Sequence, residues 1–207
     1  MTFVTGYFFV KKPEKQLVFV IIDMLEVVNM KKCLIVVDYQ NDFIDGSLGF
    51  KGAIEIKDHI IKKINNYHSE MNDVIFTKDT HEQAYLDQEE GKNLPVEHCM
   101  KGSYGHKIQK DVRALIGKND KIFEKHTFPS LDLGNYLSDK TYDVIELCGL
   151  VSNICVLSNA VIVKAALPNA HIVVDALAMA SFDEDLHKKT IEIMKGLHVE
   201  VLNDEQN

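Results

Sequence analysis

Short runs of β-branched and apolar residues alternate with helical patterns along the chain from residue 33 onward. The apolar runs predict six strands, at residues 33–37, 73–77, 121–125, 143–148, 171–175 and 199–202. Between them, apolar positions at helical spacing predict helices at residues 53–70, 107–117, 130–139, 153–166 and 183–196. Strands and helices therefore alternate, which is the order of an α/β protein.

The predicted strands are apolar almost throughout, which indicates a sheet that is covered by helices on both faces. We expect a three-layer α-β-α, Rossmann-like fold with a six-stranded, mainly parallel sheet. In sheets of this kind the active site lies beyond the carboxyl ends of the strands. This rule selects five places to examine: Asp38, Lys78, Asp79, Lys125 and the stretch after Cys148.

Residues 1–29 precede the regular pattern and have a different character. Two apolar stretches flank the basic cluster KKPEK, and neither reaches the roughly 18 residues of a membrane span. The basic cluster follows the first apolar stretch, which is the wrong order for a signal peptide. Two interpretations stay open: an extension upstream of a true start at Met30, or an added edge strand or N-terminal helix. We therefore expect an extension of open status, residues 1–29, and one domain, residues 30–207.

Length, charge and cysteine content narrow the class of protein further. The 207 residues suffice for one sizeable core, and 31 acidic against 23 basic side chains give a formal net charge of −8. This balance repels phosphate backbones and anionic lipid, so we expect neither a nucleic-acid nor a membrane partner. The four cysteines show no CxxC spacing, which argues against a disulfide framework or a zinc ribbon. Free thiols fit a cytoplasmic protein.

The segment after the fourth predicted strand has the features of a nucleophile site. Gly149 permits a tight turn, and Ser152 or Asn153 can cap the following helix. Cys155 then lies in the first helical turn, where free N–H groups and the positive dipole end stabilise a thiolate. The same N–H groups can stabilise an oxyanion. The alternative is a buried structural cysteine, which is the commoner fate of a free thiol.

Two other strand ends offer groups that can activate a thiol. Asp38 ends the first strand and Lys125 ends the third, so both can project to the same rim as Cys155. A carboxylate beside a lysine and a thiol can move a proton from sulfur to a leaving group. Taken singly, Asp38 reads as a turn or helix cap and Lys125 as a solvated charge. Their coincidence with Cys155 at three strand ends favours catalysis.

A metal site is predicted after the second strand. In Asp79-Thr-His81 the period-two alternation of an extended segment places both potential ligands on one side. His98 and Glu90 can complete a site for zinc, iron or manganese that leaves positions for water and substrate. A lone Asp-x-His is a weak pattern, and the alternative is an isolated surface histidine. We accept that alternative for His59, His68, His106, His126 and His187.

Five blocks, in order, resemble the isochorismatase-like cysteine hydrolases and, within them, the nicotinamidases. The blocks are VVDYQNDFIDGSL, KDTH, LPVEHCMKGSYG, IFEKHTF and CGLVSNICVLSNA, and the resemblance covers residues 31–202. It implies a catalytic triad of Asp38, Lys125 and Cys155. It also implies a cis peptide between Leu150 and Val151, and an oxyanion hole made of the backbone N–H groups of Val151 and Cys155.

The resemblance also implies a metal site and a pocket for a substrate ring. It assigns the metal ligands to Asp79, His81 and His98, with Glu90 as a further candidate. Phe43 matches a residue that lines the ring pocket. Leu94 stands where the family often has a ring-stacking Trp, and this chain has no Trp. This departure bears on which amide is the substrate.

The function implied is that of a metal-assisted cysteine amidohydrolase. We expect a nicotinamidase, which converts nicotinamide and water to nicotinate and ammonia through a thioester on Cys155, as in NAD salvage. One divalent metal ion is expected, zinc before iron or manganese, with a small-molecule amide as substrate and a homo-oligomeric state. Two alternatives are a related amidase acting on N-carbamoyl or ureido amides, and a non-catalytic thiol-sensing or interaction module on the same fold.

Overall fold

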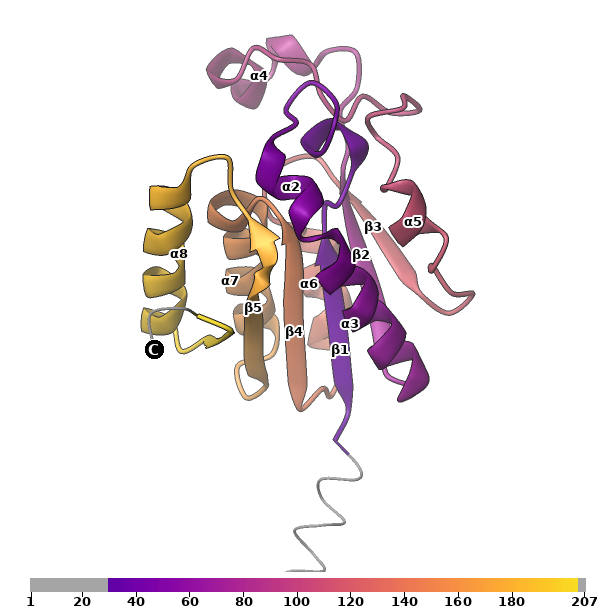
Figure 1. Cartoon of the computed structure of the whole chain (residues 1–207), viewed down its shortest axis with the longest axis vertical. Helices are drawn as coiled ribbons and strands as arrows, with labels where there is room; N and C mark the ends of the chain where they lie inside the picture. The colour runs from indigo at the N-terminus through magenta and orange to yellow at the C-terminus, as the bar shows by residue number, and fades with distance from the viewer. Residues whose placement is uncertain (1–29, 205–207) are drawn as a thin grey trace, which may run out of the picture. The chain divides into compact units, whose positions relative to one another are not determined.

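The structure is a computed structural model that describes residues 30–204, so the prediction for residues 1–29 lies outside the described residues. Six strands form one sheet in the order β3-β2-β1-β4-β5-β6 (Figure 1). Each neighbouring pair of strands is parallel. The predicted α/β fold with a six-stranded sheet is confirmed, and the sheet is parallel throughout rather than mainly so.

The strands follow the predicted apolar runs, and three of them continue further at their carboxyl ends. Their bounds are Lys32–Val37 (β1), Asp73–Asp79 (β2), Lys121–Lys125 (β3), Val144–Leu150 (β4), His171–Ala180 (β5) and Glu200–Leu202 (β6). β2 continues through polar residues because these still pair with β3, and its last residue, Asp79, lies opposite Lys125. Two of the candidate site residues are therefore neighbours across two strands.

The helices agree less closely with the predicted ranges. They are Lys51–Glu55 (α2), Lys57–Ser69 (α3), Glu89–Asn93 (α4), Lys110–Arg113 (α5), Leu131–Ser138 (α6), Leu157–Ala166 (α7) and Glu184–Gly196 (α8). The predicted helix at 107–117 is wrong in extent. Ile108 forms a β-bridge with Gln40, and Gln109 caps α5 by accepting N–H groups from its first turn. In the part of the chain that the structure describes, every helix is too short or too polar to cross a membrane.

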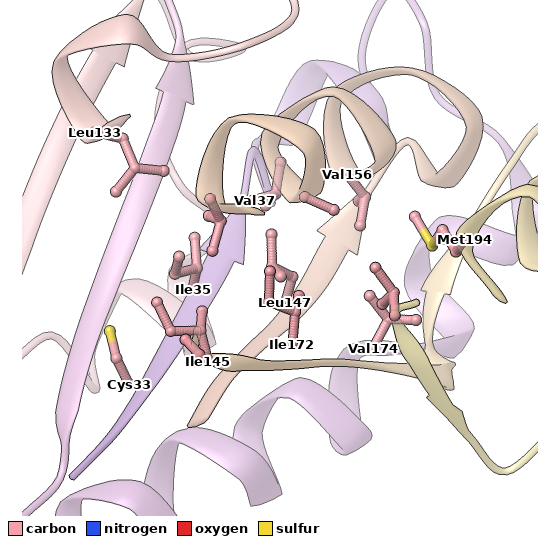
Figure 2. Packing of buried hydrophobic residues seen from close by; sticks show 14 of the residues in the cluster. Cys33, Ile35, Val37, Leu133, Ile145, Leu147, Val156, Ile172, Val174 and Met194 are labelled. Atoms are coloured by element: carbon pink, nitrogen blue, oxygen red, sulfur yellow. The ribbon is translucent and has the colours of Figure 1, made fainter. Parts of the chain in front are cut away.

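Both faces of the sheet are buried, and β1 shows how. Cys33, Ile35 and Val37 face one apolar cluster, whereas Leu34 and Val36 face the other. Side chains of α6, α7 and α8 complete the first cluster (Figure 2), and α3 covers the second. Each fully buried aliphatic side chain contributes about 1.5–3 kcal/mol relative to exposure. The unbroken apolar run of β1 thus corresponds to a strand in a sheet that forms the middle of three layers.

Candidate active site

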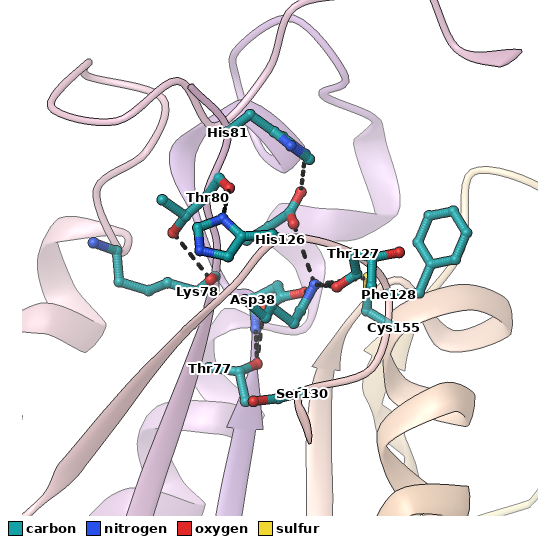
Figure 3. Close-up of polar contacts among 12 residues, drawn as sticks. Asp38, Thr77, Lys78, Thr80, His81, His126, Thr127, Phe128, Ser130 and Cys155 are labelled. Carbon is teal, nitrogen blue, oxygen red and sulfur yellow. Dashed lines mark hydrogen bonds and ion pairs between the residues drawn. The ribbon is translucent and has the colours of Figure 1, made fainter. Parts of the chain in front are cut away.

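Asp38, Lys125 and Cys155 meet at the carboxyl end of the sheet. The Lys125 Nζ atom lies 2.6 Å from Asp38 Oδ2 and 3.5 Å from Cys155 Sγ. All three residues are buried, and Figure 3 shows Asp38 and Cys155 converging on this point. The structure therefore brings together the three strand-end residues that the sequence singles out.

The backbone and a neighbouring threonine fix the orientation of Asp38. Its φ is +46°, a left-handed conformation that Asp tolerates better than most residues do. The Thr77 hydroxyl donates to Asp38 Oδ1 at 2.7 Å (Figure 3). Oδ2 pairs with the Lys125 ammonium at 2.6 Å. One oxygen of Asp38 is thus held in place while the other stays able to accept a proton.

Lys125 is a buried cation with two carboxylates and the Cys155 thiol around it. Besides Asp38 and Cys155, its ammonium contacts Asp79 Oδ1 at 3.3 Å and donates to the Thr127 carbonyl at 3.1 Å. Burial alone would lower the pKa of Lys125, but Asp38, Cys155 and Asp79 together raise it well above its ordinary value. Lys125 therefore keeps its proton at neutral pH.

The thiol and the catalytic carboxyl both hold protons more tightly than usual. Burial raises the pKa of Cys155 well above its ordinary value, although Lys125 acts in the opposite direction. Burial likewise raises the pKa of Asp38 against the effect of Lys125. In the resting site the proton is therefore on sulfur, and a thiolate forms when a nearby base accepts that proton.

Gly149 allows β4 to end close to β1. Its φ is +115°, and a Cβ atom there would lie 2.1 Å from the carbonyl oxygen of Val37, so a larger residue does not fit. The following Leu150–Val151 peptide bond is cis, as the resemblance implies. Val151 and Cys155, the two residues with the expected oxyanion donors, both line the cavity described below.

The turn that carries Cys155 is a π-helical turn, Ser152–Val156, ahead of α7. The predicted capping role of Ser152 or Asn153 is wrong, because no side chain caps this turn. These two side chains instead anchor the turn to the segment after β5. Ser152 Oγ lies 2.9 Å from His187 Nδ1, and Ser181 Oγ donates to Asn153 Oδ1 at 2.7 Å.

The four candidate metal ligands form one cluster beside the triad. One ligand atom from each of Asp79, His81, Glu90 and His98 lies within 4.8 Å of the others. Asp79 Oδ2 is 3.0 Å from His81 Nε2 and 3.3 Å from His98 Nε2. Glu90 Oε1 is 3.6 Å and 3.9 Å from the same two nitrogens. Two imidazoles and two carboxylates suit zinc, iron or manganese.

The protonation and bonding of this cluster fit a divalent cation. Glu90 Oε2 is buried and has no hydrogen-bond partner among the described residues. Burial and the charge of Asp79 raise the pKa of Glu90. Burial would also raise the pKa of Asp79, but Lys125 and hydrogen bonds from His81 and His98 lower it instead. Asp79 and Glu90 are two carboxylates close together, and one oxygen of Glu90 lacks a hydrogen-bond partner among the described residues. A bound cation would neutralise their charge.

Two polar side chains that sequence reasoning missed hold the metal segment. The Gln40 amide accepts the N–H of Asp79 at 2.7 Å and donates to its carbonyl at 2.9 Å. Asp42 Oδ2 accepts the N–H of Cys99, next to His98, at 2.6 Å. Both lie in the VVDYQNDFIDGSL block, where polar residues directly after a buried strand are the available signal.

The expectation of a surface position is wrong for His106. This residue is 5% exposed, and its Nε2 lies 2.9 Å from the Thr80 hydroxyl. His59 and His126 are exposed, and His68 and His187 are half-buried. Lys78, one of the strand-end candidates, contacts Glu124 and His106 instead of the triad. It points away because neighbouring residues of a strand face opposite sides.

Tyr85 is a further buried residue in contact with the cluster. Its ring lies 4.4 Å from that of His81 and 5.1 Å from that of His98, measured between centroids. Its hydroxyl donates to the carbonyl of Leu94 at 2.8 Å. Tyr85 therefore connects the two histidines to the segment that carries Leu94. A single tyrosine between strands carries no signal of this in the sequence.

One cavity of about 770 Å³ reaches both clusters. Its wall includes Cys155 of the triad and three of the candidate metal ligands, and the predicted pocket residues Phe43 and Leu94 also line it. Three further aromatic residues in the wall have no signal in the sequence pattern: Phe50, Phe128 and Phe182. The volume is that of a small-molecule site.

The isochorismatase domain, as a family model, matches residues 32–206. The chain belongs to the isochorismatase family, and it is a hydrolase of that family. The resemblance read from the five sequence blocks is confirmed. Family membership favours the hydrolase over the non-catalytic module.

Individual relatives agree with this assignment. The chain is 30% identical to the uncharacterized isochorismatase family protein PncA of Bacillus subtilis (strain 168), over 76% of this chain and 91% of that protein. Among solved structures it resembles the nicotinamidase/pyrazinamidase PncA from Bacillus subtilis, with a TM-score of 0.74 and 28% identity over 84% of this chain and 100% of that one. It also resembles N-carbamoylsarcosine amidase from Thermoplasma acidophilum, with a TM-score of 0.71 and 26% identity over 86% of this chain and 100% of that one.

Proposed function

We propose that this hydrolase is a nicotinamidase, which converts nicotinamide and water to nicotinate and ammonia. The observation that carries the proposal is one cavity that reaches both Cys155, in contact with Lys125, and the cluster of Asp79, His81, Glu90 and His98. The similarity to the nicotinamidase/pyrazinamidase of Bacillus subtilis supports it.

In the first half of the proposed reaction, the Cys155 sulfur attacks the carboxamide carbon as Asp38 accepts the thiol proton. Burial raises the pKa of Asp38, so it is a stronger base than an exposed carboxylate. Lys125, 3.5 Å from sulfur, stabilises the negative charge as it forms. The N–H groups of Val151 and Cys155 bind the oxyanion. The C–N bond then breaks, and Asp38 returns its proton to the departing ammonia.

In the second half, water attacks the thioester carbon. Asp38 accepts a proton from this water, and the C–S bond breaks as that proton returns to the Cys155 sulfur. Nicotinate leaves, and the site is restored. Lys125 stays protonated throughout, because the anionic groups around it raise its pKa. It therefore balances the charge that moves between Asp38 and Cys155.

The metal ion would be held by Asp79, His81 and His98, with Glu90 as a fourth ligand. When bound, it would supply a Lewis acid that coordinates the pyridine nitrogen and orients the ring, a positional rather than a hydrolytic role. Phe43, whose ring lies 5.9 Å from that of His98, would form one wall of the ring pocket. Leu94 would form another, since it also lines the cavity.

An ammonia-release assay tests this function. We expect hydrolysis of nicotinamide and pyrazinamide with kcat/KM of about 10⁴ M⁻¹ s⁻¹ or more, the lower end for ordinary enzymes. N-carbamoyl and ureido amides belong in the same screen and should react more slowly. No ammonia from either pyridine or pyrazine amide would overturn the proposal.

The metal requires a test of its own. Protein purified without added metal should contain one divalent ion per chain, zinc before iron or manganese, when its metal content is measured. His81→Ala should lose the ion and raise the KM for nicotinamide, whereas the matched control His59→Ala, an exposed histidine on α3, should keep both. A His81→Ala variant with unchanged metal content and KM would contradict the assignment.

A second candidate function is hydrolysis of N-carbamoyl amides. It is favoured by the likeness to N-carbamoylsarcosine amidase, which is close in extent to the likeness to the nicotinamidase. Such an amidase needs the triad but does not need the metal cluster to be occupied. Preferential turnover of N-carbamoyl substrates by metal-free protein would therefore select this alternative.

The cellular setting follows from the same proposal. The four cysteines are free thiols in the structure, which suits the reducing cytoplasm. Production of nicotinate would place the enzyme in NAD salvage. A homo-oligomer is also proposed, and size-exclusion chromatography with light scattering on the full chain measures it.

A further inference from the structure

The aromatic residues of the active-site cavity fall into two groups. Phe43 lies at the metal end, in edge contact with His98. Phe50 and Phe182 form a second edge-on pair, with ring centroids 6.3 Å apart. Phe50 precedes α2 and Phe182 precedes α8, so two loops far apart in the sequence build this second group. The cavity thus has an aromatic wall that neither the triad nor the metal cluster uses.

This second wall is more exposed than the first, although Phe50 itself is half-buried. Phe182 is 62% exposed and Phe128, on the loop after β3, is 41% exposed, whereas Phe43 is 6% exposed. Both exposed rings line the same cavity as Cys155, and Figure 3 shows Phe128 beside Cys155. Apolar side chains grouped at the mouth of a site remain exposed to water unless a ligand covers them.

The cavity also exceeds what one ring requires. Its volume of about 770 Å³ lies in the upper part of the range for drug-sized ligands. A single pyridine ring is too small to fill this volume, so a ring held between the metal cluster and Cys155 would leave space next to Phe50, Phe128 and Phe182. Charged side chains in the cavity wall come from the metal cluster and from Glu89 on α4, so the unfilled part is mainly apolar.

Resting on the proposed function, we infer that the preferred substrate is an aromatic carboxamide that bears an apolar substituent. The carboxamide lies at Cys155 and the ring nitrogen at the metal cluster. The substituent packs on Phe50, Phe182 and Phe128, which form the outer subsite. Binding energy gained there, away from the bond that breaks, raises kcat/KM.

A matched substrate series tests the outer subsite. The series is nicotinamide and its methyl, propyl and phenyl derivatives, substituted at the ring carbon meta to both the nitrogen and the carboxamide, which points away from both anchored groups. We expect kcat/KM to rise along the series, by about tenfold or more for phenyl over hydrogen, because each step buries more apolar area.

Variants identify the wall that supplies the gain. Phe182→Ala should reduce the ratio of kcat/KM for the phenyl derivative to that for nicotinamide by about tenfold. The matched control is Leu186→Ala, another exposed apolar residue at the start of α8 that does not line the cavity. Its ratio should equal that of the wild type.

The possible outcomes separate this inference from the proposed function. Hydrolysis of nicotinamide with no gain along the series would overturn the inference and leave the nicotinamidase intact. No turnover of any member would overturn both. If Phe182→Ala converts an oligomer to monomers without changing the ratio, the aromatic wall belongs to a subunit interface and the inference is overturned.

Discussion

Lys63 and Lys125 are both lysines that lie between two carboxylates, but their surroundings differ. Lys63, on α3, has its Nζ atom 2.5 Å from Glu146 and 2.5 Å from Asp175, on β4 and β5. The remaining oxygen of Glu146 accepts from the Tyr67 hydroxyl at 2.9 Å. The remaining oxygen of Asp175 accepts from the Asn203 amide and a backbone N–H. Each carboxylate oxygen in this cluster therefore has a partner.

The Lys125 cluster differs from the Lys63 cluster in the partners of its lysine. Asp38 also has a partner on each oxygen, the Thr77 hydroxyl and the Lys125 ammonium, so the difference comes from another contact of the lysine. Lys125 also contacts the Cys155 thiol, which lines the cavity. A network in which the lysine pairs with carboxylates alone holds a helix on a sheet. A network that also includes a thiol at a cavity allows a proton to move between the thiol and a carboxylate. The difference lies in the partners and not in the residue types.

Replacing the thiol should have the largest effect on activity. Cys155→Ala removes the nucleophile, so we expect kcat for ammonia release to fall by on the order of 10⁴-fold or more. The control is Cys148→Ala, a second fully buried cysteine on β4. It should cost about 1 kcal/mol of unfolding free energy and keep kcat near the wild-type value. Equal losses of kcat in both variants would contradict the assignment of Cys155.

The two lysines provide the most direct comparison. Lys125→Met should lower kcat by about 10³-fold, because the charge that stabilises the thiolate is lost. Lys63→Met should keep kcat, yet it should lower the free energy of unfolding by about 3 kcal/mol, because two carboxylates lose their cation. Urea unfolding and ammonia release measure both variants. If Lys63→Met loses activity while it stays folded, the distinction between the clusters fails.

A smaller loss is expected at the anchor of the nucleophile turn. His187→Ala leaves the Ser152 hydroxyl without its partner on α8, which loosens the turn that carries Cys155. We expect kcat to fall by about tenfold with little change in KM, because misplacement of the nucleophile weakens the chemical step more than binding. The exposed His59→Ala serves as the control. A similar loss of kcat in that variant would contradict the role of His187 in positioning Cys155.

The smallest effect should be the change of unfolding free energy with pH. The carboxylates of the two clusters should change it in opposite directions. Burial would raise the pKa of Asp175, but hydrogen bonds from Asn203 and Lys63 lower it below its ordinary value. Its ionised form therefore stabilises the fold above about pH 4, and this contribution is lost as the pH falls through the lowered pKa. Asp175→Asn should cost about 1–3 kcal/mol at neutral pH and less in acid.

Asp38 should show the opposite dependence. Its pKa is raised by burial, so the folded state favours the protonated form and loses stability as the pH rises through that pKa. The stability of Asp38→Asn relative to the wild type should therefore increase with pH. Unfolding in urea at several pH values measures both variants. If the unfolding free energies of Asp175→Asn and Asp38→Asn, each relative to the wild type, change with pH in the same direction, the two clusters do not differ in this way.

The fold and several site residues could be predicted because they depend on local patterns. Unbroken apolar runs such as β1 are typical of a parallel sheet, and its active site lies at the carboxyl ends of the strands. That rule selects Asp38, Asp79 and Lys125 from the sequence alone. Helix ends were predicted less well, because Ile108 pairs with Gln40, far away in the sequence, instead of extending α5.

Other features depend on contacts that no local pattern encodes. His106 carries the same side chain as the exposed His59, yet packing buries it against Thr80. The aromatic outer subsite brings together Phe50 and Phe182, although four strands, β2 to β5, lie between them in the sequence. Such residues have no spacing that relates one to the other.

The sequence by itself determined the order of strands and helices, the residues at the strand ends and the family, because these depend on apolar periodicity and on short blocks. The tertiary structure decided which strands lie side by side, and so placed Asp79 opposite Lys125. It also decided which of two similar lysines contacts a thiol that lines a cavity, and which has carboxylates alone as its partners in the described part of the chain. Partner geometry and burial set the charge state of a group, and both arise only when distant segments pack together.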